Sequence, residues 1–387
     1  MKNIIDYVET EMQSFDEAPF SPLDSLVLSQ FSYIHFDNLA PTDRDPALPF
    51  YICDALRAEF FDSMLTNTRD PSENKQLLLA LAASPRFREI EMCYYISEFD
   101  ATEGKQFSAV CFVLDKGLNY LAFRGTDDTI VGWKEDFSMA FKNPVPSQQR
   151  AAEYFLTVSE KLNGRLMLGG HSKGGNLAVY AAMTAPPLLQ NRILQVYDHD
   201  GPGFKDGVLD CEGYRRIKEK IQKTIPESSL VGMLLDGHES YSVIESSRIG
   251  FMQHDPFSWK ISNGHFITTE HVSDGALYIN RSLRDWLDSL SDEERERFVE
   301  VLFNVLDAGN AQTFAEITHE WRKNLAAIFT AMKDTDPEMK QFMRQLLKEF
   351  GVKLMRNIRA HRAPELPPGI SQDSHPDKSY SASVPTR

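Results

Sequence analysis

The chain lacks the features of membrane-spanning, secreted and nucleic-acid-binding proteins. None of its apolar runs approaches the roughly 18 residues of a membrane-spanning helix, so no integral membrane association is expected. Residues 1–7 contain no basic stretch followed by an apolar segment, which makes a cytoplasmic protein the expectation. The formal net charge of −15 argues against nucleic-acid binding and against docking on anionic lipid.

Cysteine is scarce as well. The four cysteines are far apart and form no C-x-x-C pair: Cys53, Cys93, Cys111 and Cys211. Their apolar or mixed surroundings predict buried thiols rather than disulfides or a metal site. The sequence implies no cofactor and contains no internal repeat.

The most informative segment that is present surrounds a serine. Ser172 stands in Gly-His-Ser-Lys-Gly-Gly, after the apolar run 164–169 and before the small-residue run 176–182. A strand, G-x-S-x-G and a helix in this order force the serine into a sharp turn, with its hydroxyl exposed above a sheet. Gly170 and Gly174 leave room for the close backbones of such a turn, and the helix N-terminus favours an oxyanion there. The pattern predicts that Ser172 is a nucleophile.

Hydrophobic periodicity divides the chain into stretches. Residues 1–90 show helical spacing and are expected to form a helical N-terminal flank. Residues 91–280 alternate strands with helices, which predicts an α/β fold with a mainly parallel sheet covered on both faces. A C-terminal helical bundle is expected over 281–360 and a disordered tail over 361–387.

The same periodicity predicts individual elements. Helices are expected over 23–34, 50–65, 74–83, 148–162, 208–222, 314–332 and 337–358, and after a capping box at 291–294. Strands are expected over 93–99, 107–114, 118–123, 164–169, 193–199 and 230–235, with a hairpin at 241–253.

A nucleophilic serine needs a histidine base that follows it by at least one strand and helix in this class of fold. Five of the histidines after Ser172 qualify by their position within the predicted α/β region: His199, His238, His254, His265 and His271. His199 ends the first strand after the serine, where the acid is expected. His254 is favoured because it follows the last strand-like segment and precedes the turn-forming Asp255-Pro256. Its alternative role is that of an ordinary loop histidine, and the remaining three are expected on the solvated surface.

Two aspartates at predicted strand ends compete to be the acid that orients the base. Asp200 follows strand 193–199 in a Gly-Pro-Gly turn, and Asp236 follows segment 230–235. Asp200 is preferred, because its rigid turn would hold a carboxylate still enough to fix an imidazole tautomer. Either residue is otherwise an ordinary turn aspartate.

The oxyanion donors are expected to be the backbone N–H of Lys173 and a group from an earlier loop. Arg-Gly-Thr-Asp follows strand 118–123, and there the N–H and hydroxyl of Thr126 both qualify. A plain strand-end turn with Asp127 as a helix cap fits the same residues equally well.

Together these residues resemble the class 3 (fungal-type) lipases. The resemblance rests on Phe-Arg-Gly-Thr at 123–126 with Trp133 and Asp136, on the serine segment, and on His254 with Trp259. More closely, residues 3–259 resemble a bacterial family of intracellular, uncharacterised lipase-like α/β-hydrolases. The resemblance implies an α/β-hydrolase fold with Ser172 as nucleophile, His254 as base and Thr126 as oxyanion residue.

Two positions depart from the lipases. Lys173 replaces a hydrophobic residue, although only its backbone N–H is needed. Ser229 stands where the lipases carry the acid, so the acid is expected elsewhere: Asp200 first, then Asp236, then Asp255.

The sequence therefore predicts a serine hydrolase that cleaves carboxylic esters through an acyl-enzyme intermediate. A soluble acyl ester, thioester or lysophospholipid is the expected small-molecule substrate, with the helical flanks as walls of an acyl pocket. One alternative is a catalytically silent hydrolase fold that binds a protein partner through its helical flanks. Another is an acyltransferase or thioesterase, which differs from an esterase in the acceptor or the bond cleaved.

Overall fold

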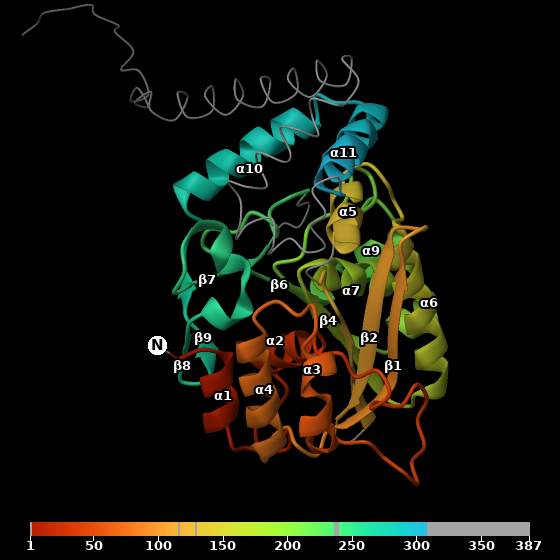
Figure 1. Cartoon of the computed structure of the whole chain (residues 1–387), viewed down its shortest axis with the longest axis vertical. Helices are drawn as coiled ribbons and strands as arrows, with labels where there is room; N and C mark the ends of the chain where they lie inside the picture. Colours follow the sequence, from red (N-terminus) through yellow and green to blue (C-terminus); the bar gives the residue numbers. More distant parts are fainter. Residues whose placement is uncertain (1, 115–116, 128–129, 236–239, 308–387) are drawn as a thin grey trace, which may run out of the picture.

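The computed structural model describes residues 2–114, 117–127, 130–235 and 240–307 (Figure 1). Several expectations lie outside these residues, namely the helices 314–332 and 337–358, the tail 361–387, the alternative acid Asp236, and His238.

An eight-stranded sheet forms the centre of the molecule, in the order β1-β2-β3-β4-β5-β6-β7-β10. The strands are β1 (Glu91–Asp100), β2 (Lys105–Val113), β3 (Leu118–Phe123), β4 (Arg165–His171), β5 (Ile193–His199), β6 (Ile221–Pro226), β7 (Ser242–Ile244) and β10 (Thr268–Thr269). Strands β3 to β7 run parallel, whereas β1, β2 and β10 join antiparallel at the two ends. Strands β8 (Ile261–Ser262) and β9 (His265–Phe266) form a separate small pair.

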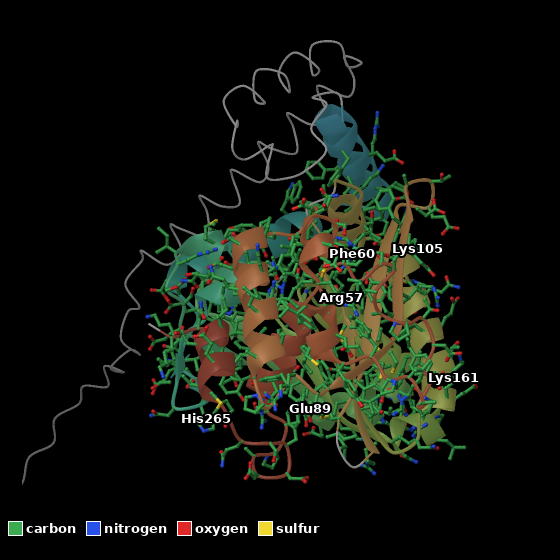
Figure 2. All side chains as sticks on the ribbon, turned by 60° about the horizontal axis from the view of Figure 1, so that its bottom comes forward. Arg57, Phe60, Glu89, Lys105, Lys161 and His265 are labelled. Carbon is green, nitrogen blue, oxygen red and sulfur yellow. The ribbon has the colours of Figure 1, made fainter. Side chains whose placement is uncertain are left out.

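Helices cover both faces of this sheet. One layer contains α1 (Ile4–Thr10), α2 (Pro22–Phe31) and α4 (Pro71–Ala83), and the other contains α6 (Pro146–Lys161), α7 (Lys173–Thr184) and α9 (Glu212–Ile217). The expected α/β-hydrolase class, a mainly parallel sheet between two helical layers, is confirmed. Charged side chains such as Glu89 and Lys161 lie on the outside of this body (Figure 2).

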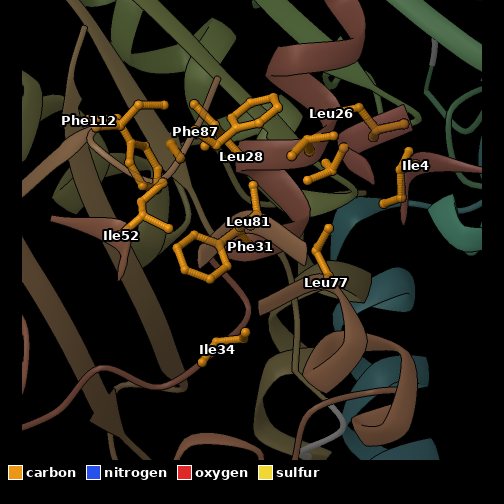
Figure 3. Close-up of a cluster of buried hydrophobic side chains, with 14 of the residues drawn as sticks. Ile4, Leu26, Leu28, Phe31, Ile34, Ile52, Leu77, Leu81, Phe87 and Phe112 are labelled. Atoms are coloured by element: carbon orange, nitrogen blue, oxygen red, sulfur yellow. The ribbon is translucent and has the colours of Figure 1, made fainter. Parts of the chain in front are cut away.

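The side-chain alternation of the strands explains the two layers. In β2, Val110 and Phe112 belong to the apolar cluster of the N-terminal helices, whereas Ala109 and Cys111 belong to the cluster on the other face. Successive strand residues point to opposite faces, so a strand apolar at every position must be covered twice. Figure 3 shows Phe112 among side chains of α1, α2 and α4. Residues 2–90 therefore share one buried core with the sheet.

Two predicted helices are shorter or more broken than expected. Segment 50–65 forms the 3-10 turns η1 (Ile52–Ala55) and η2 (Ala58–Phe60), followed by α3 (Phe61–Met64). The reason is tertiary, because the N–H groups of Ile52 and Cys53 donate to the carbonyls of Ile90 and Arg88 rather than along a helix. The predicted helix 208–222 is also wrong beyond α9, since β6 begins at Ile221.

Two strand predictions are wrong as well. Segment 230–235 is a turn in which Leu234 N–H donates to Val231 O, and the strand of that region is β6. A buried lysine and a proline within β6 hide its strand character in the sequence. The hairpin expected at 241–253 consists of β7 and the 3-10 helix η5 (Gly250–His254).

Four further helices complete the described chain: α5 (Ile130–Ser138), α8 (Pro187–Gln190), α10 (Asp274–Leu287) and α11 (Asp292–Asp307). Hydrophobic periodicity did not predict α5, α8 or α10 as separate helices. The capping box before α11 is confirmed, because Ser291 N–H donates to Glu294 Oε2 at 2.8 Å and Glu294 N–H donates to Ser291 Oγ at 3.2 Å. Helices α10 and α11 lie near α5 (Figure 1), where Val299 and Phe303 pack against Ala140.

All four cysteines are free thiols. Cys93 and Cys111 are buried as expected, but Cys53 is half-buried and Cys211 is exposed. Cys211 precedes α9, and its Sγ accepts a hydrogen bond from Tyr214 N–H at 3.4 Å. In the described part of the chain, no helix has the length and apolar character needed to cross a membrane.

A buried ion pair anchors the N-terminal layer. Arg86 Nη2 lies 2.7 Å from Asp24 Oδ2, and the two side chains are 1% and 0% exposed. The guanidinium also donates to Asp24 Oδ1 at 2.8 Å and to Gln13 O at 2.7 Å. Tyr7 Oη donates to Asp24 Oδ1 at 2.9 Å, so this one carboxylate connects α1, α2 and the turn after α4.

We expect Arg86→Met to lower the free energy of unfolding by about 3–5 kcal/mol, because the substitution leaves the Asp24 carboxylate buried without its cation. Urea unfolding followed by circular dichroism measures the change. Arg88→Met is the control: Arg88 is 47% exposed, its pair with Glu89 is on the surface, and about 0–1 kcal/mol is expected. Equal effects of the two substitutions would contradict this account.

Candidate active site

The serine stands in a strained turn between β4 and α7. Ser172 has φ +58° and ψ −132°, a conformation that non-glycine residues rarely adopt and that is retained where the surroundings enforce it. A Cβ on Gly170 would clash with the backbone of Gly174, and a Cβ on Gly174 would clash with the carbonyl of Phe123. Glycine is therefore required at both positions that flank the serine, for the reason inferred from the sequence.

Two side chains from later in the chain reach this turn. His254, the last residue of η5, places Nε2 2.9 Å from Ser172 Oγ. Its Nδ1 lies 2.6 Å from Oδ2 of Asp200, which follows β5 directly. The exposed fractions are 8% for Ser172, 6% for His254 and 0% for Asp200. The structure thus brings three of the predicted site residues into one hydrogen-bonded chain, with only the serine end close to open space.

The Asp200 carboxylate has a second set of partners on its other oxygen. Oδ1 accepts hydrogen bonds from Ser229 Oγ at 2.5 Å and from Gly232 N–H at 3.1 Å. Burial raises the pKa of Asp200 to about 7, and the Ser229 hydroxyl, the Lys223 charge and the Gly232 N–H act in the opposite direction. Ser229, the residue that the sequence resemblance places where the lipases carry their acid, is here a hydrogen-bond donor to the Asp200 carboxylate.

The imidazole of His254 is held from several sides. Its ring centroid lies 4.6 Å from that of His171, and its backbone carbonyl lies 2.8 Å from His171 Nε2. Trp259 Nε1 donates to the carbonyl of Gln253, the residue before His254, at 2.9 Å. Burial, assisted by the positive charge of Arg69, lowers the pKa of His254 to about 3. With its proton on Nδ1, the neutral ring donates to Asp200 and leaves Nε2 to accept from the serine.

The loop after β3 lies against the serine turn. A Cβ on Gly174 would lie 3.1 Å from Gly125 N, and a Cβ on Gly125 would clash with the Tyr33 hydroxyl and with His171 O. Thr126 Oγ1 donates to Asp136 Oδ2 at 2.5 Å, so the hydroxyl points to α5. The backbone of this loop is therefore close to the serine, while the threonine hydroxyl has another partner.

The other candidates have different surroundings. His199 is buried, with Nε2 2.9 Å from Ser25 Oγ and Nδ1 2.7 Å from Thr224 Oγ1. His265 and His271 are exposed, as expected, and Figure 2 shows His265 at the edge of the molecule. Asp255, the third choice for the acid, pairs with Arg248 and accepts from Phe257 N–H at 3.0 Å. None of these replaces Asp200 beside the imidazole.

One group of carboxylates has metal-ligand spacing among the described residues: Asp70, Glu73 and Asp255. Arg248 is paired with both Glu73 and Asp255, so a guanidinium already compensates two of the three charges. This group contacts neither Ser172 nor Asp200 by any described hydrogen bond, and it has no part in the chemistry derived below.

An apolar cavity of about 270 Å³ opens beside the serine. Ser172 and Asp136 contribute to its wall, and apolar side chains from α5, the 230–234 turn, α10 and α11 provide most of the rest. Phe137, Leu234 and Trp286 are among them. No described residue of 2–90 lines this cavity. Of the two helical flanks expected to wall an acyl pocket, only the described residues of the C-terminal one line this cavity.

Two side chains beside Ser172 have no role in the predictions made from the sequence, those of His171 and Lys173. His171 stands directly before the serine, and this position is the only sequence signal for it. The Lys173 side chain is 0% exposed and its Nζ lies 3.0 Å from Glu135 Oε2. The only sequence signal for this contact is a lysine placed among small, buried residues.

The chain is similar, at low identity, to several solved structures of lipases. The propeptide complex of Rhizomucor miehei lipase is 17% identical, with a TM-score of 0.31, over 41% of this chain and 57% of that chain. M37 lipase is 14% identical, with a TM-score of 0.35, over 55% and 70% of the two chains. A deletion mutant of the Rhizomucor miehei complex is 14% identical, with a TM-score of 0.34, over 57% and 64%. The chain thus spans little more than half of the native Rhizomucor miehei lipase chain, 57%.

No curated protein sequence matches the chain. The Mbeg1-like family model matches residues 81–304, which run from the end of α4 to α11 and make up more than half of the 387 residues. The protein therefore belongs to the Mbeg1-like family.

Proposed function

We propose that the protein is a serine hydrolase that cleaves carboxylic esters through an acyl-enzyme intermediate. The observation that carries the proposal is the hydrogen-bonded chain from Asp200 through His254 to Ser172, with distances of 2.6 and 2.9 Å. A serine hydroxyl is a weak nucleophile unless an adjacent base takes its proton, and an imidazole needs an acid that fixes its tautomer. These distances meet both requirements.

In the proposed acylation step, Ser172 Oγ attacks the ester carbonyl carbon while its proton passes to His254 Nε2. The carbonyl oxygen becomes an oxyanion that faces the backbone N–H groups of Lys173 and Thr126. The tetrahedral intermediate then collapses, the bond to the alcohol oxygen breaks, and His254 returns the proton to the departing alcohol. Asp200 stays ionised and stabilises the imidazolium that exists between these two transfers.

Deacylation repeats these steps with water. His254 Nε2 accepts a proton from a water molecule as its oxygen attacks the acyl carbonyl. Collapse of the second tetrahedral intermediate releases the carboxylic acid and restores the Ser172 hydroxyl with the proton from His254. An alcohol or a thioester in the corresponding positions would follow the same route, so acyl transfer and thioester cleavage share the proposed acylation machinery.

The cavity supports an apolar acyl group as the part of the substrate that is recognised. Its volume of about 270 Å³ is at the small end of the ~300–1,000 Å³ typical of ligand sites, and its wall is largely hydrophobic. A single acyl chain matches this size better than a lipid with several chains. We therefore propose monoacyl esters as the substrate class.

The silent scaffold is an alternative because serine stands in the place of the lipase acid. In the structure Asp200 lies 2.6 Å from the imidazole, and Ser229 donates to that same carboxylate. This arrangement supports an acid that comes from a different strand end, rather than an acid that has been lost. It therefore favours the enzyme over the scaffold.

We expect wild-type protein to hydrolyse nitrophenyl esters, with kcat/KM rising from acetate to hexanoate as the acyl chain fills the cavity. Ser172→Ala and His254→Ala should each lower kcat by about 10⁴-fold or more, because either change removes the activated nucleophile. Ser172→Ala should also abolish labelling by a fluorophosphonate, measured by intact-protein mass spectrometry.

His265→Ala is the matched control, because His265 is an exposed histidine outside the site. Its activity should equal that of the wild type. A folded wild-type protein that neither reacts with fluorophosphonates nor hydrolyses any ester of the series would refute the hydrolase and leave the scaffold.

We also expect the enzyme to lose activity at acidic pH. Protonation of Asp200 removes the ionised carboxylate that stabilises the imidazolium, and since burial raises the pKa of Asp200 to about 7, kcat/KM should decline as the pH falls through about 7. The Ser229 hydroxyl stabilises the ionised carboxylate, so Ser229→Ala should raise the pKa of Asp200. The acid limb should move upward by about one pH unit, as expected for a lost hydrogen bond to a charged group.

The matched control is Ser228→Ala, whose Oγ lies 2.9 Å from Ser273 Oγ and not at the Asp200 carboxylate. Its pH profile of kcat/KM should overlay that of the wild type. An unmoved or downshifted acid limb in Ser229→Ala would show that Ser229 does not support the ionised acid.

A further inference from the structure

A buried ion pair lies directly behind the nucleophile. Lys173, the residue after Ser172, places Nζ 3.0 Å from Glu135 Oε2, with side chains 0% and 1% exposed. Glu135 belongs to α5, and Lys173 is the first residue of α7. The pair therefore joins the helix that begins at the nucleophile to the helix that follows the Thr126 loop.

The hydrogen bonds of this pair are saturated. Lys173 Nζ also donates to Gln106 O at 2.9 Å and to Gln106 Oε1 at 3.0 Å, which gives one acceptor for each ammonium proton. Glu135 Oε1 accepts from Ser147 N–H at 2.8 Å, and Oε2 accepts from Ser147 Oγ at 2.7 Å. Four segments, β2, α5 and the first turns of α6 and α7, thus contribute groups to this ion pair through hydrogen bonds of defined direction.

Stability alone is a weak reason to keep such a pair. Removing two charges from water costs several kcal/mol, and well-packed apolar residues in their place are often equally or more stabilising. An ion pair with saturated hydrogen bonds does fix distance and direction between its backbones, which apolar packing does less strictly. The pair therefore constrains the backbones of α5 and α7 more strictly than apolar packing would.

The next residue of α5 provides the connection. Asp136 Oδ2 accepts the Thr126 hydroxyl at 2.5 Å, and its Oδ1 lies 4.0 Å from Lys173 Nζ. A chain of contacts thus runs from the Lys173 side chain through Glu135 and Asp136 to Thr126. Its two ends are the residues whose backbone N–H groups form the proposed oxyanion hole.

The Lys173 charge also acts on Asp136. Burial raises the pKa of Asp136 to about 7, and the ammonium of Lys173 opposes that rise. An ionised carboxylate is the better acceptor for the Thr126 hydroxyl. The ammonium therefore supports the contact at the far end of the chain in addition to its own hydrogen bonds.

We propose that Lys173 and Glu135 are positioning residues that set the separation of the two oxyanion donors, the backbone N–H groups of Lys173 and Thr126. The proposal rests on the hydrolase function proposed above. Oxyanion donors act when they lie about 2.7–3.1 Å from the developing charge, and a misplacement of about 1 Å costs on the order of 10²-fold in rate. The side chain of one donor thus holds the helix that orients the other.

The test compares Lys173→Met and Glu135→Gln with wild type in steady-state ester hydrolysis. Both substitutions remove the ion pair, and Glu135→Gln preserves the shape of the side chain, so it decides the matter if Lys173→Met does not fold. We expect kcat to fall about 10- to 100-fold while KM changes less than threefold, because the donors act on the transition state. Lys142→Met is the control, since Lys142 forms an exposed ion pair with Glu296 and should keep wild-type kcat.

A double-mutant cycle with Thr126→Val distinguishes positioning from general destabilisation. Thr126→Val breaks the contact with Asp136 at the other end of the chain. If the ion pair acts through that contact, Glu135→Gln should lower kcat much less in the Thr126→Val background than in wild type. A purely structural role would lower the free energy of unfolding and leave the two effects on kcat independent.

The outcomes separate this inference from the proposed function. Wild-type turnover that requires Ser172, combined with unchanged kcat in Glu135→Gln, would overturn the positioning role and leave the hydrolase intact. Additive effects in the cycle would also overturn it. An absence of Ser172-dependent turnover in wild type would overturn both proposals.

Discussion

The contact between Asp200 Oδ2 and His254 Nδ1 is the interaction on which the rest of the site depends. It joins the end of β5 to η5 across a distance of 54 residues in the sequence, at 2.6 Å. Without it, the Asp200 carboxylate would be fully buried with only Ser229 and Gly232 as hydrogen-bond partners, and the imidazole would have no fixed tautomer. The parallel sheet makes the contact possible, because consecutive parallel strands deliver their carboxyl ends to the same edge.

The two helical layers have different relations to this edge. The N-terminal layer packs its apolar side chains, with Phe31 and Leu81 among them, against the sheet and is anchored by the buried pair of Arg86 and Asp24. It provides no wall of the apolar cavity. The C-terminal helices α10 and α11 pack near α5 and line the cavity together with it. In the proposed hydrolase, one layer stabilises the sheet and the C-terminal addition selects the acyl group.

The sequence predicted the parts of the fold and site that depend on local patterns. The glycines around Ser172 predict a tight turn. The apolar composition of strands β1 to β5 indicates that they are strands. The preference for Asp200 rested on the rigidity of its turn, and that carboxylate is the one found beside His254. Strand β6 is not predicted from the sequence, because Lys223 and Thr224 are buried polar residues whose hydrogen-bond partners come from other elements. No local pattern reveals the pairing of Lys173 with Glu135, since the two are 38 residues apart and belong to different helices.

The most direct test of the central claim is a crystal structure of the protein after reaction with an alkyl fluorophosphonate. The account predicts a phosphorus atom bonded to Ser172 Oγ and a phosphoryl oxygen within about 2.7–3.1 Å of the backbone nitrogens of Lys173 and Thr126. The alkyl chain should occupy the cavity beside α10 and α11. An adduct on another residue, or a phosphoryl oxygen directed away from both nitrogens, would contradict the account.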